Sequence, residues 1–144
     1  MNMTDLEFFY RGLNPLCQVA ELIGICIRQD KCKLFAARPG NEQNDQRPSL
    51  DDLLPSADVI SLHCPLNDAT KHLLNKERLA KAKPSLLIVN CARGGIIDEE
   101  AALEALRSGS IGGLAVDVLP VEPPKDGHAL LDALANAEPL NLIV

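Results

Sequence analysis

Residues 85–109, SLLIVNCARGGIIDEEAALEALRSG, carry the strongest signals for the fold. Their first part, 85–90, is almost continuously apolar, which is typical of a parallel strand covered on both faces. Asp98 then predicts the start of a helix, because its carboxylate caps free backbone N–H groups and two glutamates follow in the positive first turn. Gly109 predicts the end of that helix. The stretch therefore predicts a strand, a connecting turn and a helix.

The same alternation extends to both sides of this stretch. Short apolar or β-branched runs predict further strands at 58–63, 114–118 and 140–144. Capping residues predict short helices that begin after Ser49 and after Asn75. Alternating strands and helices imply a parallel sheet with helices on its faces, and 144 residues fit a single α/β domain. Ligands bind such sheets at the carboxyl ends of the strands.

Composition argues against several classes of function. The net charge is −6, from 14 basic and 20 acidic residues, and an acidic surface repels nucleic-acid phosphates. No apolar run approaches the roughly 18–20 residues that span a bilayer, and the acidic N-terminus is unlike a secretory signal. Five cysteines include no Cys-x-x-Cys pair, and three histidines show no metal-ligand spacing. We therefore expect a cytoplasmic protein with no membrane, nucleic-acid or metal partner.

Polar residues stand at the ends of two predicted strands and in the loop that follows. Arg93 precedes two glycines, Asp117 interrupts an apolar run and Glu122 precedes two prolines. Taken singly, Arg93 and Glu122 are more simply explained as a surface side chain in a tight turn and an ordinary loop carboxylate. Asp117 is less easily explained, because a carboxylate inside an apolar strand costs several kcal/mol unless it is paired or lies at the open end of the strand.

Three separated stretches agree in order and spacing with one known family. They are DVISLHCPL at 58–66, NCARGGIIDEEAAL at 90–103 and GGLAVDVLPVEPP at 112–124. In them the chain resembles the D-isomer-specific 2-hydroxyacid dehydrogenases, and within that family the glycerate dehydrogenase and hydroxypyruvate reductase-like members. The resemblance implies a Rossmann-type, three-layer α/β fold: one NAD(P)-binding domain, incomplete relative to the family.

The resemblance also implies roles for individual residues. Arg93 matches the catalytic arginine that binds the substrate carboxylate and carbonyl, and a guanidinium suits this role because it binds carboxylates through two parallel hydrogen bonds. Glu122 matches the glutamate that orients the catalytic histidine. Asp117 matches the residue that contacts the nicotinamide carboxamide. The other positions that match dinucleotide contacts are Cys64, Pro65, Thr70, Cys91, Ala92 and Arg93.

The first third of the chain departs from the family. Of the expected Gly-x-Gly-x-x-Gly fingerprint, the stretch GLNPLC at 12–17 keeps only the first glycine. We therefore divide the domain, residues 1–144, into a divergent first part, 1–48, and a family-like second part, 49–144. Arg38 stands where the family usually has an acidic residue on the adenosine ribose, which favours NADP over NAD. A solvated arginine at a strand end is the alternative.

Flanking parts of the family's sequence are also missing. Neither half of the substrate domain is present, and the chain ends at Val144, before the Thr-Pro-His whose histidine is the general acid. The resemblance therefore predicts an oxidoreductase domain that uses NAD or NADP on 2-oxo acids such as hydroxypyruvate or glyoxylate and is inactive as an isolated chain. The alternatives are a non-catalytic module that binds a dinucleotide or a partner chain, and a fragment with no function of its own. A homodimer is one expected assembly.

Overall fold

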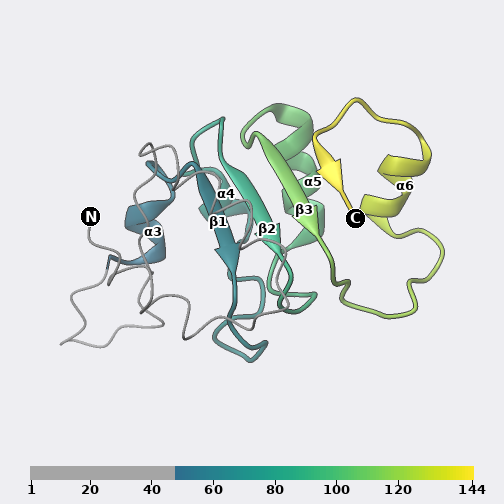
Figure 1. Ribbon diagram of the computed structural model, residues 1–144, viewed down its shortest axis with the longest axis horizontal. Coiled ribbons are helices and arrows are strands. Elements are labelled where there is room, and N and C mark those ends of the chain that lie inside the picture. Colours follow the sequence, from purple (N-terminus) through teal and green to yellow (C-terminus); the bar gives the residue numbers. More distant parts are fainter. Residues whose placement is uncertain (1–47) are drawn as a thin grey trace, which may run out of the picture. The chain divides into compact units, whose positions relative to one another are not determined.

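Four parallel strands form one sheet in the part of the chain that the computed structural model describes, residues 48–144 (Figure 1). Their order in the sheet is their order in the sequence: β1 Val59–Leu62, β2 Leu87–Asn90, β3 Gly113–Val116 and β4 Leu142–Ile143. In the register, Leu87 pairs with Val59 on one side and with Gly113 on the other. All four strands lie where the sequence predicts them, with β3 beginning one residue early.

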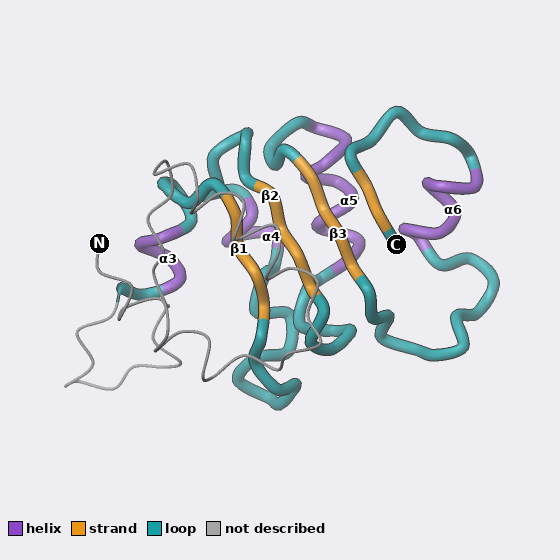
Figure 2. Tube along the Cα trace, in the orientation of Figure 1, coloured by secondary structure: helices purple, strands orange, loops and turns teal. Residues whose placement is uncertain are grey.

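A helix precedes each strand, as in other α/β folds (Figure 2). The helices are α3 Leu50–Leu53, α4 Lys76–Leu79, α5 Glu99–Ser108 and α6 Ala129–Ala135. Crossovers between parallel neighbours are right-handed, which favours placing successive helices on the same side of the sheet. In agreement, α5 contacts α4, α6 and β3, and α4 and α5 lie behind the strands in Figure 2.

The sequence marks both ends of helix α5, with a start signal at Asp98 and a stop signal at Gly109. The Asp98 side chain accepts a hydrogen bond from the Ala101 N–H at 3.1 Å, which satisfies one of the groups that a helix start leaves unpaired. Gly109 ends the helix with a φ of +72°, which glycine adopts without steric penalty. The buried face of α5 consists of Ala101, Ala102, Leu103, Ala105 and Leu106. The predicted helix is confirmed.

The short helices α3 and α4 also begin at their predicted caps. The Ser49 hydroxyl accepts the Asp52 N–H, and the Asp52 carboxylate accepts the Ser49 N–H, each at 3.2 Å, so that the two residues form a capping box. The Asn75 side chain accepts the N–H of Arg78 at 3.0 Å at the start of α4. Local side-chain chemistry therefore places both helices.

The helix α6 is absent from the sequence predictions. Its N-cap residue, His128, makes no side-chain capping bond, so the usual start signal is missing. Leu130 and Ala133 are buried, on a helix that packs against α5. Tertiary packing rather than a local signal therefore stabilises α6.

The two faces of the sheet differ in exposure. Under the helices the buried strand residues are Leu62, Ile88, Leu114, Val116 and Leu142. On the other face Leu87 is 39% exposed, and Val89, predicted to be buried, is half-buried. Ile60, in the predicted strand 58–63, is also half-buried, because β1 has a described neighbour on one side only. A second helical layer, which the three-layer prediction requires over the exposed face, is not among residues 48–144.

Candidate functional site

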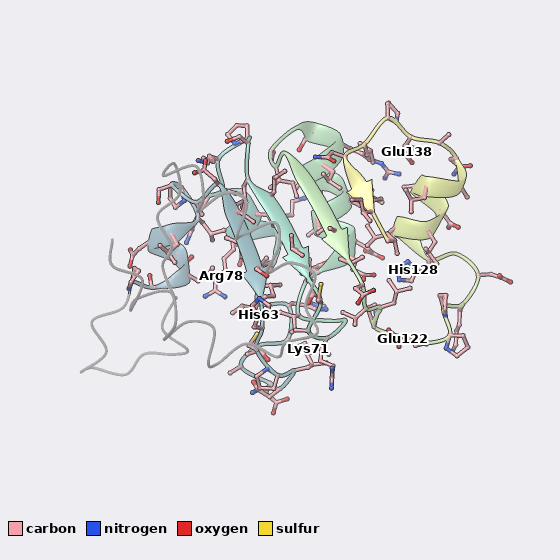
Figure 3. All side chains as sticks on the ribbon, viewed as in Figure 1. His63, Lys71, Arg78, Glu122, His128 and Glu138 are labelled. Atoms are coloured by element: carbon pink, nitrogen blue, oxygen red, sulfur yellow. The ribbon has the colours of Figure 1, made fainter. Side chains whose placement is uncertain are left out.

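Three chain segments leave the carboxyl ends of the strands and lie along one edge of the sheet. They are residues 63–75 after β1, 91–98 after β2 and 117–128 after β3. Figure 3 shows His63, Lys71 and Glu122 at this edge, toward which the strand arrows point, and Glu138 at the opposite edge. In open α/β sheets ligands bind beyond the carboxyl ends of the strands, so this edge is the candidate site.

The turn after β2 is built around a buried asparagine. Asn90 is 1% exposed and is the only polar residue that is buried among residues 48–144. Its Oδ1 accepts the N–H of Ala92 at 3.1 Å, and its Nδ2 donates to the carbonyl of Arg93 at 2.9 Å. The exposed Arg93 guanidinium extends from this turn and donates from Nη1 to the Ala92 carbonyl at 2.7 Å. Because an unpaired buried amide costs about 1–3 kcal/mol, these bonds favour one backbone conformation at 91–93.

Gly94 allows the segments after β2 and β3 to touch. A Cβ added at Gly94 would lie 2.1 Å from the carbonyl carbon of Leu119, so only glycine fits there. The N–H of Asp117 also donates to the carbonyl of Asn90 at 3.0 Å. Because Arg93 adjoins Gly94 and Asp117 lies just before Leu119, both predicted site residues belong to segments in direct contact.

The segment after β1 forms a compact turn that is joined to the same edge. The Thr70 hydroxyl donates to the carbonyl of Pro65 at 2.6 Å, and the Asn67 side chain accepts the N–H of Thr70 at 3.1 Å. The N–H of His72 donates to the carbonyl of Gly95 at 2.8 Å, which ties this turn to the segment after β2. Pro65 and Thr70, both predicted to contact a dinucleotide, are therefore on a segment fixed to the Arg93 turn.

The segment after β3 is held near its two ends by carboxylates. Glu122 Oε1 accepts the N–H of Leu119 at 3.0 Å. At the other end, His128 Nε2 lies 2.9 Å from Glu99 Oε2, and the two side chains are only 13% and 12% exposed. Burial raises the pKa of Glu99, and the neighbouring His128 opposes part of that rise. His128 Nδ1 is buried and has no hydrogen-bond partner among the described residues, so the imidazole belongs to the packing between α5 and α6.

Arg93, Asp117 and Glu122 all lie at the predicted edge, but their side chains do not pair with each other. All three are exposed. Within residues 48–144 no hydrogen bond or ion pair joins one of them to another. The structure brings their backbone segments together instead, through the contacts of Asn90 and Gly94. Their catalytic and cofactor-binding roles stay predictions.

The other candidate residues are divided between described and undescribed parts of the chain. Cys64 is half-buried against the core, and burial raises the pKa of its thiol, which disfavours the reactive thiolate. Cys91 and Ala92 are half-buried in the Arg93 turn. Arg38 and the glycine stretch 12–17 lie outside the described residues. Across 48–144, no three His, Cys, Asp or Glu side chains are grouped to hold a metal, and no helix has the length and apolarity to cross a membrane.

Asn90 and Gly94 shape the site, although the sequence suggested no separate role for either. The available signal for Asn90 was an amide at the end of an apolar strand, since a buried polar group needs hydrogen-bond partners and the following turn supplies them. The contact of Gly94 with Leu119 depends on chain that follows another strand. No local pattern reveals such a contact.

Comparison with known proteins identifies the class to which this fold and edge belong. Residues 22–137 match the family model described as D-isomer specific 2-hydroxyacid dehydrogenase, NAD binding domain. The chain belongs to this family. It is 50% identical over 84 residues to glycerate dehydrogenase of Methylorubrum extorquens, and 44% identical over 97 residues to hydroxypyruvate reductase of Thermotoga maritima. These alignments cover 58% and 65% of this chain.

A solved structure gives the same result. The chain aligns with a D-isomer specific 2-hydroxyacid dehydrogenase from Xanthobacter autotrophicus Py2 in complex with NADPH and MES, with a TM-score of 0.57 and 35% identity over 66% of this chain. The Rossmann-like α/β fold and the NAD-binding class predicted from the sequence are thereby confirmed. The chain spans only 27%, 32% and 29% of these three relatives, in the order named.

Proposed function

We propose that this chain supplies the nicotinamide-binding edge of an NAD(P)-dependent oxidoreductase that interconverts 2-hydroxy and 2-oxo acids, with hydroxypyruvate or glyoxylate as substrate. The observation that carries this proposal is the contact between segments 91–98 and 117–128, because it holds an arginine and two carboxylates at one edge of the sheet. The substrate class follows the glycerate dehydrogenase and hydroxypyruvate reductase relatives.

Arg93 has the chemistry to bind the substrate. Its guanidinium is exposed and permanently charged, and its planar set of N–H donors matches the geometry of a carboxylate. The same group stabilises negative charge that develops on the carbonyl oxygen during reduction. Because the bonds of Asn90 hold the backbone of the turn, substrate binding would displace, among residues 48–144, only the Nη1 bond to the Ala92 carbonyl.

The residues at this edge fit the nicotinamide end of a dinucleotide. The Asp117 carboxylate is exposed directly beyond β3, where it would accept a hydrogen bond from the carboxamide amino group. Pro65, Thr70 and Ala92, on the two adjoining segments, would contact the rest of the nucleotide. When bound, the reduced cofactor supplies the hydride. Arg38 would favour a 2′-phosphate, so we expect NADPH to bind more tightly than NADH.

We further propose that the chain alone does not catalyse hydride transfer. All three histidines lie in the described part, and none contacts Glu122, the residue expected to orient the general acid. His63 is hydrogen-bonded to a serine hydroxyl, and burial lowers its pKa. His128 is paired with Glu99. A developing alkoxide at Arg93 would then take its proton from water rather than from a histidine oriented by Glu122.

The test combines binding and turnover. Purified protein is mixed with hydroxypyruvate or glyoxylate and NADH or NADPH, and oxidation is followed by absorbance while binding is measured by calorimetry. We expect dissociation constants of about 1 mM or weaker, equivalent to about −4 kcal/mol, and no substrate-dependent oxidation. Arg107→Ala, at the far end of α5, is the control for Arg93→Ala.

Each outcome has a definite meaning. Oxidation that Arg93→Ala abolishes and Arg107→Ala preserves would show that the chain is itself an enzyme. Protection against unfolding by a dinucleotide, without turnover, favours the nucleotide-binding domain as proposed. Failure of both dinucleotides to bind at any attainable concentration would contradict the proposal.

A further inference from the structure

We propose that Asn90 is a positioning residue that holds the Arg93 turn and the start of the Asp117 segment in fixed relation to each other. The inference rests on the proposed function, because it concerns how two residues of that site are placed. Asn90 itself is not expected to touch substrate or cofactor. It acts through hydrogen bonds to backbone groups of both segments.

The burial of Asn90 requires an explanation. The residue pairs in the sheet with Leu62 on one side and with Val116 on the other, and both of these side chains are buried. An apolar side chain would fill this position without the desolvation penalty of an amide. Asn90 is nevertheless 1% exposed. The hydrogen bonds of the side-chain amide, rather than the surrounding core, therefore explain why an asparagine occupies this buried position.

Both polar atoms of the Asn90 side chain form hydrogen bonds with the turn that carries Arg93. The Oδ1 atom accepts the N–H of Ala92 at 3.1 Å, and the Nδ2 atom donates to the carbonyl of Arg93 at 2.9 Å. The Asn90 side chain thus restrains both the N–H of Ala92, the residue before the arginine, and the main-chain carbonyl of Arg93. A leucine of similar size at position 90 could make neither bond, and an aspartate could make only the first.

The main chain of Asn90 carries the connection to the neighbouring strand. Its carbonyl accepts the N–H of Asp117 at 3.0 Å, just beyond the last pair between β2 and β3. Asn90 therefore belongs at once to the sheet, to the Arg93 turn and to the beginning of the Asp117 segment. Loss of its side-chain bonds would free the turn while leaving the strand pairing in place.

The experiment compares Asn90→Ala and Asn90→Asp with the wild-type chain by amide hydrogen exchange and by titration with NADH and, separately, with NADPH. Asn141→Ala is the matched control, because the Asn141 side chain also donates to a backbone carbonyl, that of Gly112, at 2.8 Å. That bond lies at the edge of the sheet where the strands begin, away from the proposed site. All variants are first compared with the wild type by thermal unfolding.

We expect Asn90→Ala to speed exchange of the Ala92 amide about tenfold or more, in line with the loss of one buried hydrogen bond. Asn90→Asp should keep that amide protected, since an acceptor remains, but should still loosen Arg93. Both variants should weaken the NADH-induced shift of the Arg93 Nε–H signal, whereas Asn141→Ala should leave it unchanged. A purely structural role would instead change exchange throughout the core and would not separate the two variants.

The results separate failure of this inference from failure of the proposed function. If neither NADH nor NADPH shifts a signal in the wild type, the proposed function is wrong, while the exchange data still test Asn90. If NADH binds equally well to the wild type and to a folded Asn90→Ala, the inference is wrong. If neither variant folds, amide hydrogen exchange of the wild-type chain still tests the inference. Unprotected exchange of the Ala92 amide would overturn the inference, and protection equal to that of the core amides would support it.

Discussion

The two segments that carry Arg93 and Glu122 are held in different ways. Residues 91–98 are fixed by the strand from which they emerge, through the buried amide of Asn90. Residues 117–128 are exposed throughout 121–127 and are held mainly at the two ends, at Gly94 and at Glu99. The arginine is thus positioned by its own strand, whereas the glutamate is positioned by contact with the other segment.

The largest effect expected from this comparison concerns one glycine in each segment. A Cβ at Gly94 would overlap backbone atoms of Leu119, so we expect Gly94→Ala to lower the free energy of unfolding by about 3 kcal/mol. Gly127 has open space around it and a φ of +81°, so Gly127→Ala should cost only the roughly 1–2 kcal/mol of a left-handed residue. Urea unfolding measures both. Equal losses would show that the two segments are not packed as described.

A smaller effect is expected at Glu122. Glu122→Ala removes the acceptor for the N–H of Leu119 and should lower the free energy of unfolding by about 0.5–1 kcal/mol, while Glu122→Gln keeps an acceptor and should stay near the wild type. Hydrogen exchange should rise at Leu119 and stay unchanged at Ala92. Faster exchange at Ala92 would mean that the Arg93 turn depends on Glu122 and is not fixed by its own strand.

The smallest effect is expected in the pH dependence of stability at the Glu99–His128 contact. Burial raises the pKa of Glu99, so the folded chain holds this proton more tightly than the unfolded chain does. The stabilisation of the folded chain by protonated Glu99 is fully present below pH 4.5, the ordinary pKa of a glutamate. It is lost as the pH rises through the raised pKa of Glu99. Glu99→Gln cannot ionise, so its unfolding free energy should improve relative to the wild type as the pH increases.

The control for this titration is Glu100→Gln, which removes a charge from the same helical turn at an exposed position. Comparison of the two variants separates the burial of Glu99 from the general effect of a negative charge near a helix start. A difference between Glu99→Gln and the wild type that stays constant with pH would contradict the burial described for this pair.

Sequence and structure agree where the signal is local. Helix α5 was predictable at both ends because Asp98 and Gly109 act within one turn of their own positions. Helix α6 was not, because its stability depends on burial of Leu130 and Ala133 against a distant helix. Val89 was misjudged for a related reason: alternation along β2 puts its side chain on the face that the described helices do not cover.

The same distinction applies to the candidate site. That Arg93 and Asp117 lie at one edge was predictable, because each follows a parallel strand. That their segments touch was not, because the contact of Gly94 with Leu119 and the bond from Asp117 to Asn90 join positions far apart in sequence. The residue types therefore indicated the chemistry of the site, whereas only the folded structure showed the contacts that position those residues.

We propose that the carboxyl edge of the sheet binds the nicotinamide end of a dinucleotide. The most direct test is a titration of isotope-labelled chain with NADPH and, separately, with NADH, followed through its backbone amide signals. We expect saturable shifts at Thr70, Ala92, Arg93 and Asp117, and none at Gly112, which lies at the opposite edge before β3. Saturable shifts at Gly112 without shifts at Arg93, or no saturable shift at any amide, would contradict this proposal.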